Sequence, residues 1–418
     1  MTRPSQLKLD LENWPFALER LPRSSYLVGG AVRDGFLGRQ AEYLDLDFVL
    51  SEQAVKTARE IASQYRAGFV LLDAERQIAR VVFSGATVDF AQMEGETITE
   101  DLKRRDYTIN AIAYNPFTQE VVDPFQGQAD LNQQLIRKIS VKNLEDDPLR
   151  LLRAYRQAAQ LEFQLESETH QCLQQLASQL SQVASERICT ELNYLLALPA
   201  GVQWIQQAWT DGLLSIFFPG AEPHFSTLSQ IDSVAAGLIQ ARPSLTAELH
   251  SPLRDSLKTS RLAIAKLAML LSSDLESAKQ ELSDLKYSKV EIQSALSLLK
   301  GWQSIQQTAP AEMSLSQQYL LFKHTQDLFP ALAVVAISGG ISIQQLTPLV
   351  DRYLKPDDPV AHPTPLLTGK TLMQALNLSP SPQIGELLEA IQLAQVEGEV
   401  STVEAAVKLA QTLVKGTN

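Results

Sequence analysis

The 418-residue sequence has few of the residues that build disulfide frameworks or metal centres. It contains only two cysteines, Cys172 and Cys189, and both lie in helix-like segments. A disulfide-stapled fold is therefore excluded, and buried thiols in a reducing compartment are expected. The five histidines are scattered, without metal-ligand spacing and without a His-Asp dipeptide, which argues against a zinc enzyme or an HD phosphohydrolase.

Long apolar segments and excess positive charge are also lacking. No apolar stretch follows Met1 and no apolar run reaches membrane-spanning length, so we expect a cytoplasmic protein with no membrane partner. Acidic residues outnumber basic ones by 48 to 36, which gives a formal net charge of −12. This charge argues against extensive nucleic-acid binding, although one local basic track would suffice at a single site.

The first third of the chain mixes strand-like and helix-like segments. A short strand ends at Gly29-Gly30, and a helix over 31–37 closes at Gly38. The alternation in 44–50 predicts a strand, and 77–92 is typical of a hairpin.

The remainder of the chain, from about residue 141, loses these strand patterns. Apolar residues recur there at helical spacing, as in 173–183 and 262–271. Pro310 and the segment 354–365 interrupt the helical array. The sequence therefore predicts a small α/β head followed by a long all-helical region.

Two aspartates share one face of the predicted strand LDLDFVL. Side chains alternate along a strand, so Asp45 and Asp47 lie on the face opposite Leu46 and Phe48. Two carboxylates this close repel each other unless a cation lies between them. We interpret them as an Mg²⁺ pair, although a solvated strand face is the ordinary explanation of a DxD taken alone.

A pair of glycines precedes that strand, in VGGAVRDGFLG. Gly29 and Gly30 let the backbone approach a phosphate at a helix N-terminus, whose N–H groups favour an anion. Arg33 adds a charged donor in the first helical turn. The spacing is neither GxGxxG nor Walker, which excludes Rossmann and P-loop motifs but leaves an ordinary tight turn open.

A third carboxylate and a basic cluster follow. Asp89 lies on the polar face of the strand ATVDFAQ, and two-metal sites usually need such a third acid. A surface aspartate on a hairpin is the alternative. Lys103, Arg104 and Arg105 lie at the edge of an apolar stretch, which suits a triphosphate ligand, whereas a charge run is more often a solvated face.

A helix that starts near Pro148 carries one acidic and three basic residues at steps of three. Each step of three residues rotates the side-chain direction by about −60° around the helix axis. Asp147 and Arg150 can therefore contact the same ligand, whereas Arg156 is not expected to join them. An amphipathic helix with exposed arginines, Arg153 among them, is the alternative.

An Asp beside an Arg can distinguish nucleobases by their hydrogen-bonding edges. The carboxylate accepts from the amino group of cytosine or adenine, while the guanidinium donates to the neighbouring ring acceptor. Uracil and guanine would face Asp147 with a carbonyl, which leaves two acceptors unpaired and costs about 1–3 kcal/mol or more. This pair is therefore predicted to select C and A without a template.

Six segments in order closely resemble the class II tRNA nucleotidyltransferase and poly(A) polymerase family. They are GGAVRD, DLD, KRRDYTINAIAYNP, DPFQGQADL, IRKI and DDPLRLLRAYR, and ASERICTEL resembles the family's next helical motif. The resemblance implies an α+β protein, with a small mixed sheet of the polymerase-β-like palm type and then a helical neck, body and tail. The corresponding domains are the head 1–140, the neck 141–200, the body 201–308 and a tRNA-binding tail 309–418.

The same resemblance implies a reaction and the residues that perform it. A tRNA 3′-hydroxyl attacks the α-phosphate of CTP or ATP, and pyrophosphate leaves. Asp45 and Asp47 would hold Mg²⁺, and Asp89 completes the catalytic carboxylates. The implied nucleotide-binding residues are Gly29, Gly30, Arg33, Arg105, Asp106, Asn110, Asp147, Arg150, Arg153 and Arg156.

One segment departs from the family pattern. Only MEGETITEDL separates Gln92 from Lys103, where members that add all three nucleotides carry a considerably longer loop. Within the family, this shortening resembles enzymes that add CC and leave the terminal A to a partner. We therefore expect CC addition, followed by a separate A-adding enzyme.

Three other functions compete with this expectation. An A-adding enzyme or poly(A) polymerase would share the motifs of the head. An inactive RNA-binding descendant would be expected to have lost a carboxylate, yet Asp45, Asp47 and Asp89 are all present. An antibiotic nucleotidyltransferase usually has a Gly-Ser turn and no neck helix like DDPLRLLR.

Overall fold

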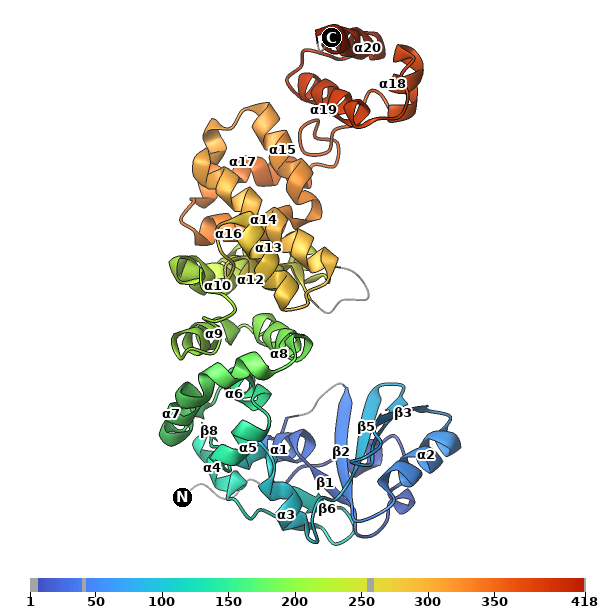
Figure 1. Cartoon of the computed structure of the whole chain (residues 1–418), viewed down its shortest axis with the longest axis vertical. Coiled ribbons are helices and arrows are strands. Elements are labelled where there is room, and N and C mark those ends of the chain that lie inside the picture. Colours follow the sequence, from blue (N-terminus) through green and yellow to red (C-terminus); the bar gives the residue numbers. More distant parts are fainter. Residues whose placement is uncertain (1–6, 40–42, 254–258, 417–418) are drawn as a thin grey trace. The chain divides into compact units, whose positions relative to one another are not determined.

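A computed structural model describes residues 7–39, 43–253 and 259–416 of the chain (Figure 1). The chain divides into two compact units, Met1–Ile216 and Phe217–Asn418. The finer division into head, neck, body and tail stays a prediction.

The first unit contains a seven-stranded sheet with the order β3-β4-β5-β2-β1-β6-β7. Strands β2 and β5 run parallel, whereas the other neighbours in this sheet are antiparallel. The mixed sheet implied by the sequence is therefore confirmed. The strands are β1 (Tyr26–Val28), β2 (Leu44–Leu50), β3 (Gly68–Asp73), β4 (Ile78–Phe83), β5 (Ala86–Gln92), β6 (Ala113–Asn115) and β7 (Glu120–Val122).

One face of this sheet is covered by apolar side chains. Phe48 of β2 stacks on Phe90 of β5 at 5.8 Å between ring centroids, and both contact Phe16. Helix α2 (Ala54–Tyr65) packs against β4 and β5. The apolar positions of LDLDFVL thus face a core, and its aspartates project from the opposite face.

The first unit contains further helices, some between strands of the sheet and the rest after them. They are α1 (Gly30–Leu37), α3 (Ile98–Lys103), α4 (Gly127–Gln133), α5 (Val141–Asp146), α6 (Leu149–Leu161), α7 (Ser167–Leu176), α8 (Ser185–Ala197) and α9 (Gly201–Thr210). Helix α6 packs against both α8 and α9. A short parallel pair joins β8 (Leu135–Ile136), at the end of the predicted head, to β9 (Gln164–Leu165) in the predicted neck. Two-residue strands are too short to show an alternating pattern, so the sequence did not predict them.

The second unit is helical throughout its described residues. It consists of α10 (Phe225–Ala241), α11 (Leu245–His250), α12 (Arg261–Ala268), α13 (Leu275–Asp284), α14 (Lys289–Gln307), α15 (Leu315–Thr325), α16 (Phe329–Ser338), α17 (Ile343–Leu354), α18 (Gly369–Leu376), α19 (Pro382–Val396) and α20 (Val403–Gly416), with short 3-10 turns between some of them. The breaks predicted at Pro310 and in 354–365 fall between helices.

Helix α16 is the central helix of this unit, since its residues from Phe329 to Ala336 are all buried and it packs against α10, α12 and α14. The stretch Leu315–Ser338 is the one candidate membrane span in the described residues, by length and composition. Of its most apolar window, 67% is buried inside the structure, as in the core of a folded unit.

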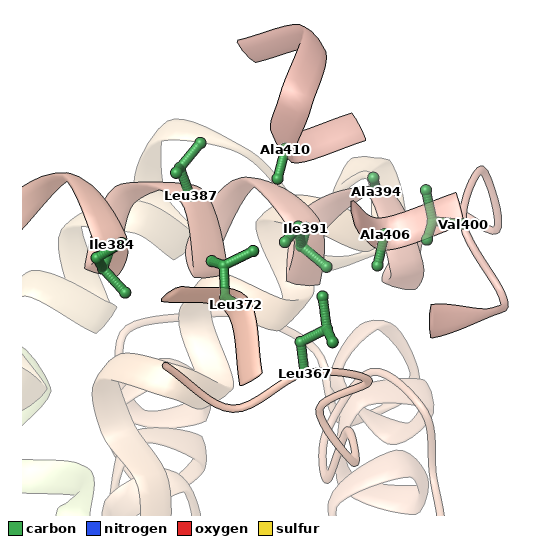
Figure 2. Close-up of a cluster of buried hydrophobic side chains, with 9 residues drawn as sticks. All are labelled: Leu367, Leu372, Ile384, Leu387, Ile391, Ala394, Val400, Ala406 and Ala410. Atoms are coloured by element: carbon green, nitrogen blue, oxygen red, sulfur yellow. The ribbon is translucent and has the colours of Figure 1, made fainter. Parts of the chain in front are cut away.

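The last three helices share an apolar cluster of their own (Figure 2). Leu372 of α18 and Ile391 of α19 lie at its centre with Ala406 and Ala410 of α20, and all four are almost completely buried. Apolar residues recur at helical spacing at the C-terminal end of the sequence because they pack these three helices together.

Candidate active site

Three carboxylates project from the face of the sheet opposite to the Phe48–Phe90 core. In the parallel pairing of β2 with β5, Asp47 lies opposite Asp89 and Asp45 lies opposite Thr87. The Thr87 hydroxyl donates to Asp45 Oδ1 at 2.7 Å and fixes that side chain. Adjacent parallel strands are about 4.8 Å apart, so this register places Asp47 and Asp89 side by side.

Asp47 is in an electrostatic environment that favours a cation. Burial and the charges of Asp89 and Asp45 raise the pKa of Asp47 while Arg105 lowers it, and together they bring it to about 6. A divalent ion between Asp45 and Asp47 would remove this repulsion. Carboxylate oxygens suit Mg²⁺, which is commonly held by one or two carboxylates together with substrate phosphates. The described residues contain no group of three or more His, Cys, Asp or Glu side chains placed to hold a metal.

Asp89 is instead held by Arg80. The Arg80 guanidinium donates from Nε to Asp89 Oδ1 at 2.6 Å and from Nη2 to Oδ2 at 2.8 Å. The two residues are directly opposite in the antiparallel pairing of β4 with β5. Sequence reasoning missed Arg80, although the register of the predicted hairpin would have placed it there. As the structure stands, both oxygens of the third carboxylate are occupied by this fork.

The glycine turn lies between Asp47 and the basic cluster. Gly29 has φ +73°, a conformation that glycine adopts without strain. A methyl group at Gly29 would come within 3.2 Å of Asp47 Oδ2 and 3.3 Å of Arg105 Nη1. The bare backbone therefore lets the carboxylate and the guanidinium approach the same point. Helix α1 begins at Gly30, one residue before the predicted start at Ala31.

Arg33 is buried beneath this turn and is held on two sides. It donates from Nε to Asp34 Oδ1 at 2.9 Å and from Nη1 to Asn110 Oδ1 at 2.8 Å. A further bond runs from Nη2 to Asp34 Oδ2 at 3.1 Å. A guanidinium carries five N–H groups, so two donors are still available to a ligand.

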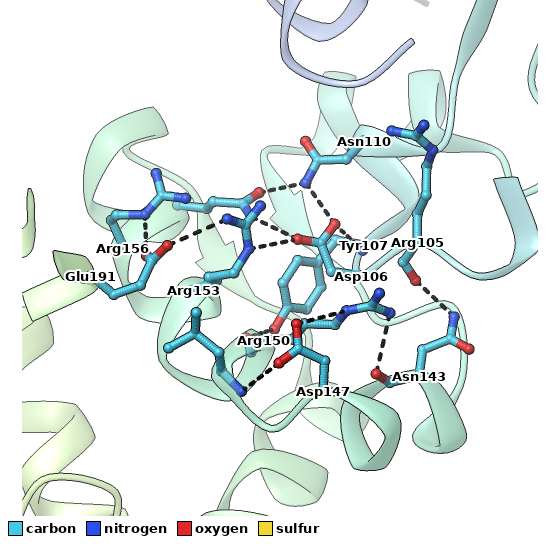
Figure 3. A network of polar contacts seen from close by, with 12 residues as sticks. Arg105, Asp106, Tyr107, Asn110, Asn143, Asp147, Arg150, Arg153, Arg156 and Glu191 are labelled. Atoms are coloured by element: carbon cyan, nitrogen blue, oxygen red, sulfur yellow. Dashed lines mark hydrogen bonds and ion pairs between the residues drawn. The ribbon is translucent and has the colours of Figure 1, made fainter. Parts of the chain in front are cut away.

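Asp106 is the centre of a buried network that joins the segment 106–110, between α3 and β6, to helix α6 (Figure 3). Its carboxylate accepts from the Asn110 amide at 2.9 Å, from the Tyr107 N–H at 2.8 Å and from Arg153 Nε at 3.1 Å. Gln157 donates the fourth bond at 3.2 Å. Burial alone would raise the pKa of Asp106, but the Arg153 charge and these donors lower it to about 2.

Arg153 and Arg156 of α6 are both held by one residue of α8. Glu191 accepts from Arg153 Nη1 at 3.3 Å and from Arg156 Nε at 2.5 Å. Arg156 thus points away from Asp147, as the three-residue spacing predicts. Neither arginine is among the residues that line the two cavities described below. Glu191 lies in ASERICTEL, and no pattern in that segment identified it as their partner.

A cavity of about 540 Å³ contains the predicted base-reading pair and the triphosphate-binding arginine, and we call it the base cavity. Asn143 donates to the carbonyls of Lys103 and Arg105 at 2.8 and 2.7 Å, and so ties the basic cluster to α5. Arg150 Nη1 donates to the carbonyls of Arg104 and Asn143 at 2.7 and 3.2 Å. The lining includes Arg104, Arg105, Asn143, Asp147, Arg150 and Arg187.

Asp147 is paired with Arg187 of α8 more closely than with Arg150. Arg187 donates from Nη1 to Asp147 Oδ1 at 3.1 Å and from Nη2 to Oδ2 at 3.0 Å, whereas Arg150 Nε lies 4.0 Å from Oδ2. Sequence reasoning missed Arg187, which lies in ASERICTEL three residues after that segment begins.

A second cavity, of about 970 Å³, is lined by Gly30, Arg33, Asp45 and Asp47, together with residues near the N-terminus such as Trp14. Asp45, Asp47 and Val49 alternate onto one face of β2, and Val49 lines the base cavity. The two cavities therefore share this face of β2, and the second one also reaches Leu44 and Leu46 of the opposite face. The structure brings together Asp45, Asp47, Gly29, Gly30 and Arg105, with Asp147 and Arg150 beyond Arg105 on that face.

Three family models match the chain. One, described as "Poly A polymerase head domain", covers residues 25–137, and another, "Probable RNA and SrmB- binding site of polymerase A", covers 162–225. A third, described as "tRNA nucleotidyltransferase domain 2 putative", covers 255–410.

Curated proteins match over nearly the whole length. A CC-adding tRNA nucleotidyltransferase of Synechocystis is 43% identical over 405 residues, which cover 96% of each chain. One of Geobacter sulfurreducens with the same name is 33% identical and covers 90% of this chain and 89% of its own. Further relatives are named A-adding tRNA nucleotidyltransferase and CCA-adding enzyme.

The fold is also found in solved structures. A CCA-adding enzyme in complex with CTP superimposes with a TM-score of 0.69 at 23% identity, over 98% of this chain and 99% of that one.

Proposed function

This chain belongs to the tRNA nucleotidyltransferase and poly(A) polymerase family, and we propose that it adds CMP to the 3′ end of tRNA without a nucleic-acid template. The tRNA 3′-oxygen forms a bond to the α-phosphorus of CTP as its proton is lost, and the bond to the leaving pyrophosphate breaks. The observation that carries the proposal is the convergence of Asp45, Asp47 and Arg105 at the Gly29 turn, on the sheet face that leads to Asp147 and Arg150.

We infer that Asp45 and Asp47 hold Mg²⁺. Asp45 is fixed by Thr87, and Asp47 has a carboxylate whose negative charge is destabilised until a cation arrives. A bound Mg²⁺ would stabilise the charge that develops on the α-phosphate and favour loss of the hydroxyl proton. Asp89 contributes to this field while Arg80 fixes its position.

The triphosphate would lie between the glycine turn and the arginines. Gly30 offers backbone N–H groups at the start of α1, and Arg33 offers two unused donors. Arg105 Nη2 lies 3.6 Å from Asp101 Oδ2, but Nε is buried and has no hydrogen-bond partner among the described residues, so this nitrogen still has a donor to offer an anion. Asp106 and Asn110 hold Arg33 and Arg153 in place and need not contact the nucleotide themselves.

The base would enter the base cavity and meet Asp147 and Arg150. The amino group of cytosine donates to the carboxylate, and the guanidinium donates to the adjacent ring acceptor. Uracil would present a carbonyl to Asp147 and leave both acceptors unpaired, which costs about 1–3 kcal/mol or more.

The short segment between β5 and α3 supports the restriction to CC addition. Residues 93–97 are bonded at both ends: Met93 N–H donates to the Leu50 carbonyl at 2.7 Å, and Glu96 N–H donates to Glu100 at 2.6 Å. Such a segment has little freedom to rearrange the site for a second kind of base. Two of the relatives described above are named CC-adding tRNA nucleotidyltransferase. The terminal A would then come from a separate A-adding enzyme.

The remaining expectations follow from this activity. The substrate is a cytoplasmic RNA, and we propose that the protein acts in that compartment. We also propose that the second unit, with the predicted tail 309–418, contributes to tRNA binding.

The test is incorporation of labelled CTP and ATP onto tRNA that lacks its 3′ end or already ends in CC. We expect two CMP additions to the first substrate and little AMP addition to the second. Asp45→Ala should abolish transfer without loss of fold, whereas Glu120→Ala, which removes an exposed carboxylate on β7, should transfer normally. Efficient AMP addition to tRNA ending in CC would refute the restriction to CC, and full activity of Asp45→Ala would refute the metal assignment.

A further inference from the structure

Arg187 binds Asp147 through a bidentate fork, with both distances close to 3 Å. The Arg187 side chain is 52% exposed and that of Asp147 is 29% exposed. An ion pair this exposed contributes little to the stability of a fold, because water screens it. Stabilising the contact of α8 with the residues before α6 therefore does not explain the well-formed fork between Arg187 and Asp147.

The hydrogen bonds of Asp147 leave one acceptor position open. A carboxylate offers about four lone-pair positions, two on each oxygen. Oδ1 accepts from Arg187 Nη1 at 3.1 Å and, at 3.4 Å, from the Leu149 N–H. Oδ2 accepts only from Arg187 Nη2 among the described residues, so one of its lone pairs has no donor.

The open position faces Arg150. Arg150 Nε lies 4.0 Å from Asp147 Oδ2, which is too long for a hydrogen bond. Arg150 uses Nη1 for the carbonyls of Arg104 and Asn143, and in the described part of the chain nothing accepts a hydrogen bond from its Nε or Nη2. An unused acceptor on Asp147 thus lies beside unused donors on Arg150, in the lining of one cavity.

We propose that Arg187 is a positioning residue for base selection. Its fork fixes the plane of the Asp147 carboxylate, so that the remaining Oδ2 lone pair accepts the exocyclic amino group of a base whose ring acceptor meets Arg150. A carboxylate that could rotate would present different lone pairs and lose this directionality. The inference rests on the proposed function and adds to it the residue that makes Asp147 selective.

The experiment compares equilibrium binding of CTP and UTP to the full-length protein with Mg²⁺, in wild type, Arg187→Lys and Arg187→Gln. The two nucleotides carry the same triphosphate, so a general loss of positive charge weakens both and cancels in their ratio. Lysine keeps the charge but lacks the planar fork. Glu186→Gln, an exposed neighbour on α8, is the matched control.

We expect both Arg187 variants to unfold at the wild-type temperature and to lose about tenfold in the ratio of UTP to CTP dissociation constants. The loss should come from weaker CTP binding, and Glu186→Gln should keep the wild-type ratio. An unchanged ratio in Arg187→Gln, or equal weakening of both nucleotides, would overturn the proposal. Binding requires no transfer, so a wild type that distinguishes CTP from UTP but does not extend tRNA would refute the proposed function alone.

Discussion

Two buried carboxylates of the site have pKa values that are shifted in opposite directions. Asp106 accepts four hydrogen bonds and faces Arg153, which lowers its pKa to about 2 and keeps it ionised as a structural anion. Asp47 accepts no hydrogen bond among the described residues, and burial raises its pKa to about 6. Hydrogen-bond donors of the protein surround Asp106 but not Asp47. The negative charge of Asp106 is therefore stabilised within the protein, whereas that of Asp47 needs a bound cation.

Asp47 should make metal binding depend on pH. The carboxyl becomes protonated as pH falls through about 6, and its attraction for a cation is then lost. We expect the dissociation constant for Mn²⁺, used as a spectroscopic substitute for Mg²⁺, to rise below about pH 6 and to be constant above about pH 7. Electron paramagnetic resonance of free Mn²⁺ measures this constant directly.

Two variants and the metal-free protein control that measurement. Asp47→Asn should bind Mn²⁺ weakly at every pH, and Glu120→Ala should follow the wild-type curve. In the metal-free protein the raised pKa means that the folded state binds the proton more tightly, so Asp47 lowers the free energy of unfolding as pH rises from about 4 to about 6. A wild-type affinity that is the same at pH 5 and pH 8 would contradict the assignment.

At the scale of elements, a single carboxylate of α8 stabilises the position of α6. Glu191 is 8% exposed and accepts from Arg153 and Arg156. Glu191→Gln keeps the shape but removes the charge, so it leaves Arg156 without its counter-ion and Arg153 with Asp106 alone. We expect the free energy of unfolding of the first unit to fall by about 2–5 kcal/mol, measured by urea denaturation. Glu186→Gln on the same helix should change it by less than about 0.5 kcal/mol; an equal loss in both variants would indicate a general effect of charge on α8.

Local patterns predicted most elements that carry the site. The alternation of LDLDFVL and the hairpin of 77–92 appear as β2, β4 and β5, and the turn at Gly29-Gly30 joins β1 to α1 as expected. Pattern alone could not show that β2 pairs in parallel with β5, because strand order depends on packing of the whole sheet. The same limit applies to charged partners. Arg187 and Glu191 reach the site from α8, and their spacing along the chain does not predict these contacts, whereas the hairpin register could have placed Arg80 beside Asp89.

At the scale of the whole molecule, the proposed nucleotide site lies entirely within the first compact unit. Every residue assigned to it falls between Gly29 and Arg187, and the unit extends to Ile216. A ligand that binds only the folded form stabilises the unit that binds it, by about 2.7 kcal/mol when its concentration is 100 times the dissociation constant. For a unit of about 200 residues this corresponds to roughly 5–10 °C in melting temperature.

Calorimetry with CTP and Mg²⁺ should therefore shift one thermal transition and leave the other in place. The shifted transition can be identified with Glu191→Gln, which should lower the same one because Glu191 also belongs to the first unit. UTP at the same concentration is the matched control ligand. It should shift this transition less, because the uracil carbonyl and the Asp147 carboxylate are both hydrogen-bond acceptors. A single transition that moves as a whole would mean that the two units unfold together, and equal shifts of two transitions would mean that the nucleotide stabilises both units; either outcome would contradict the expectation.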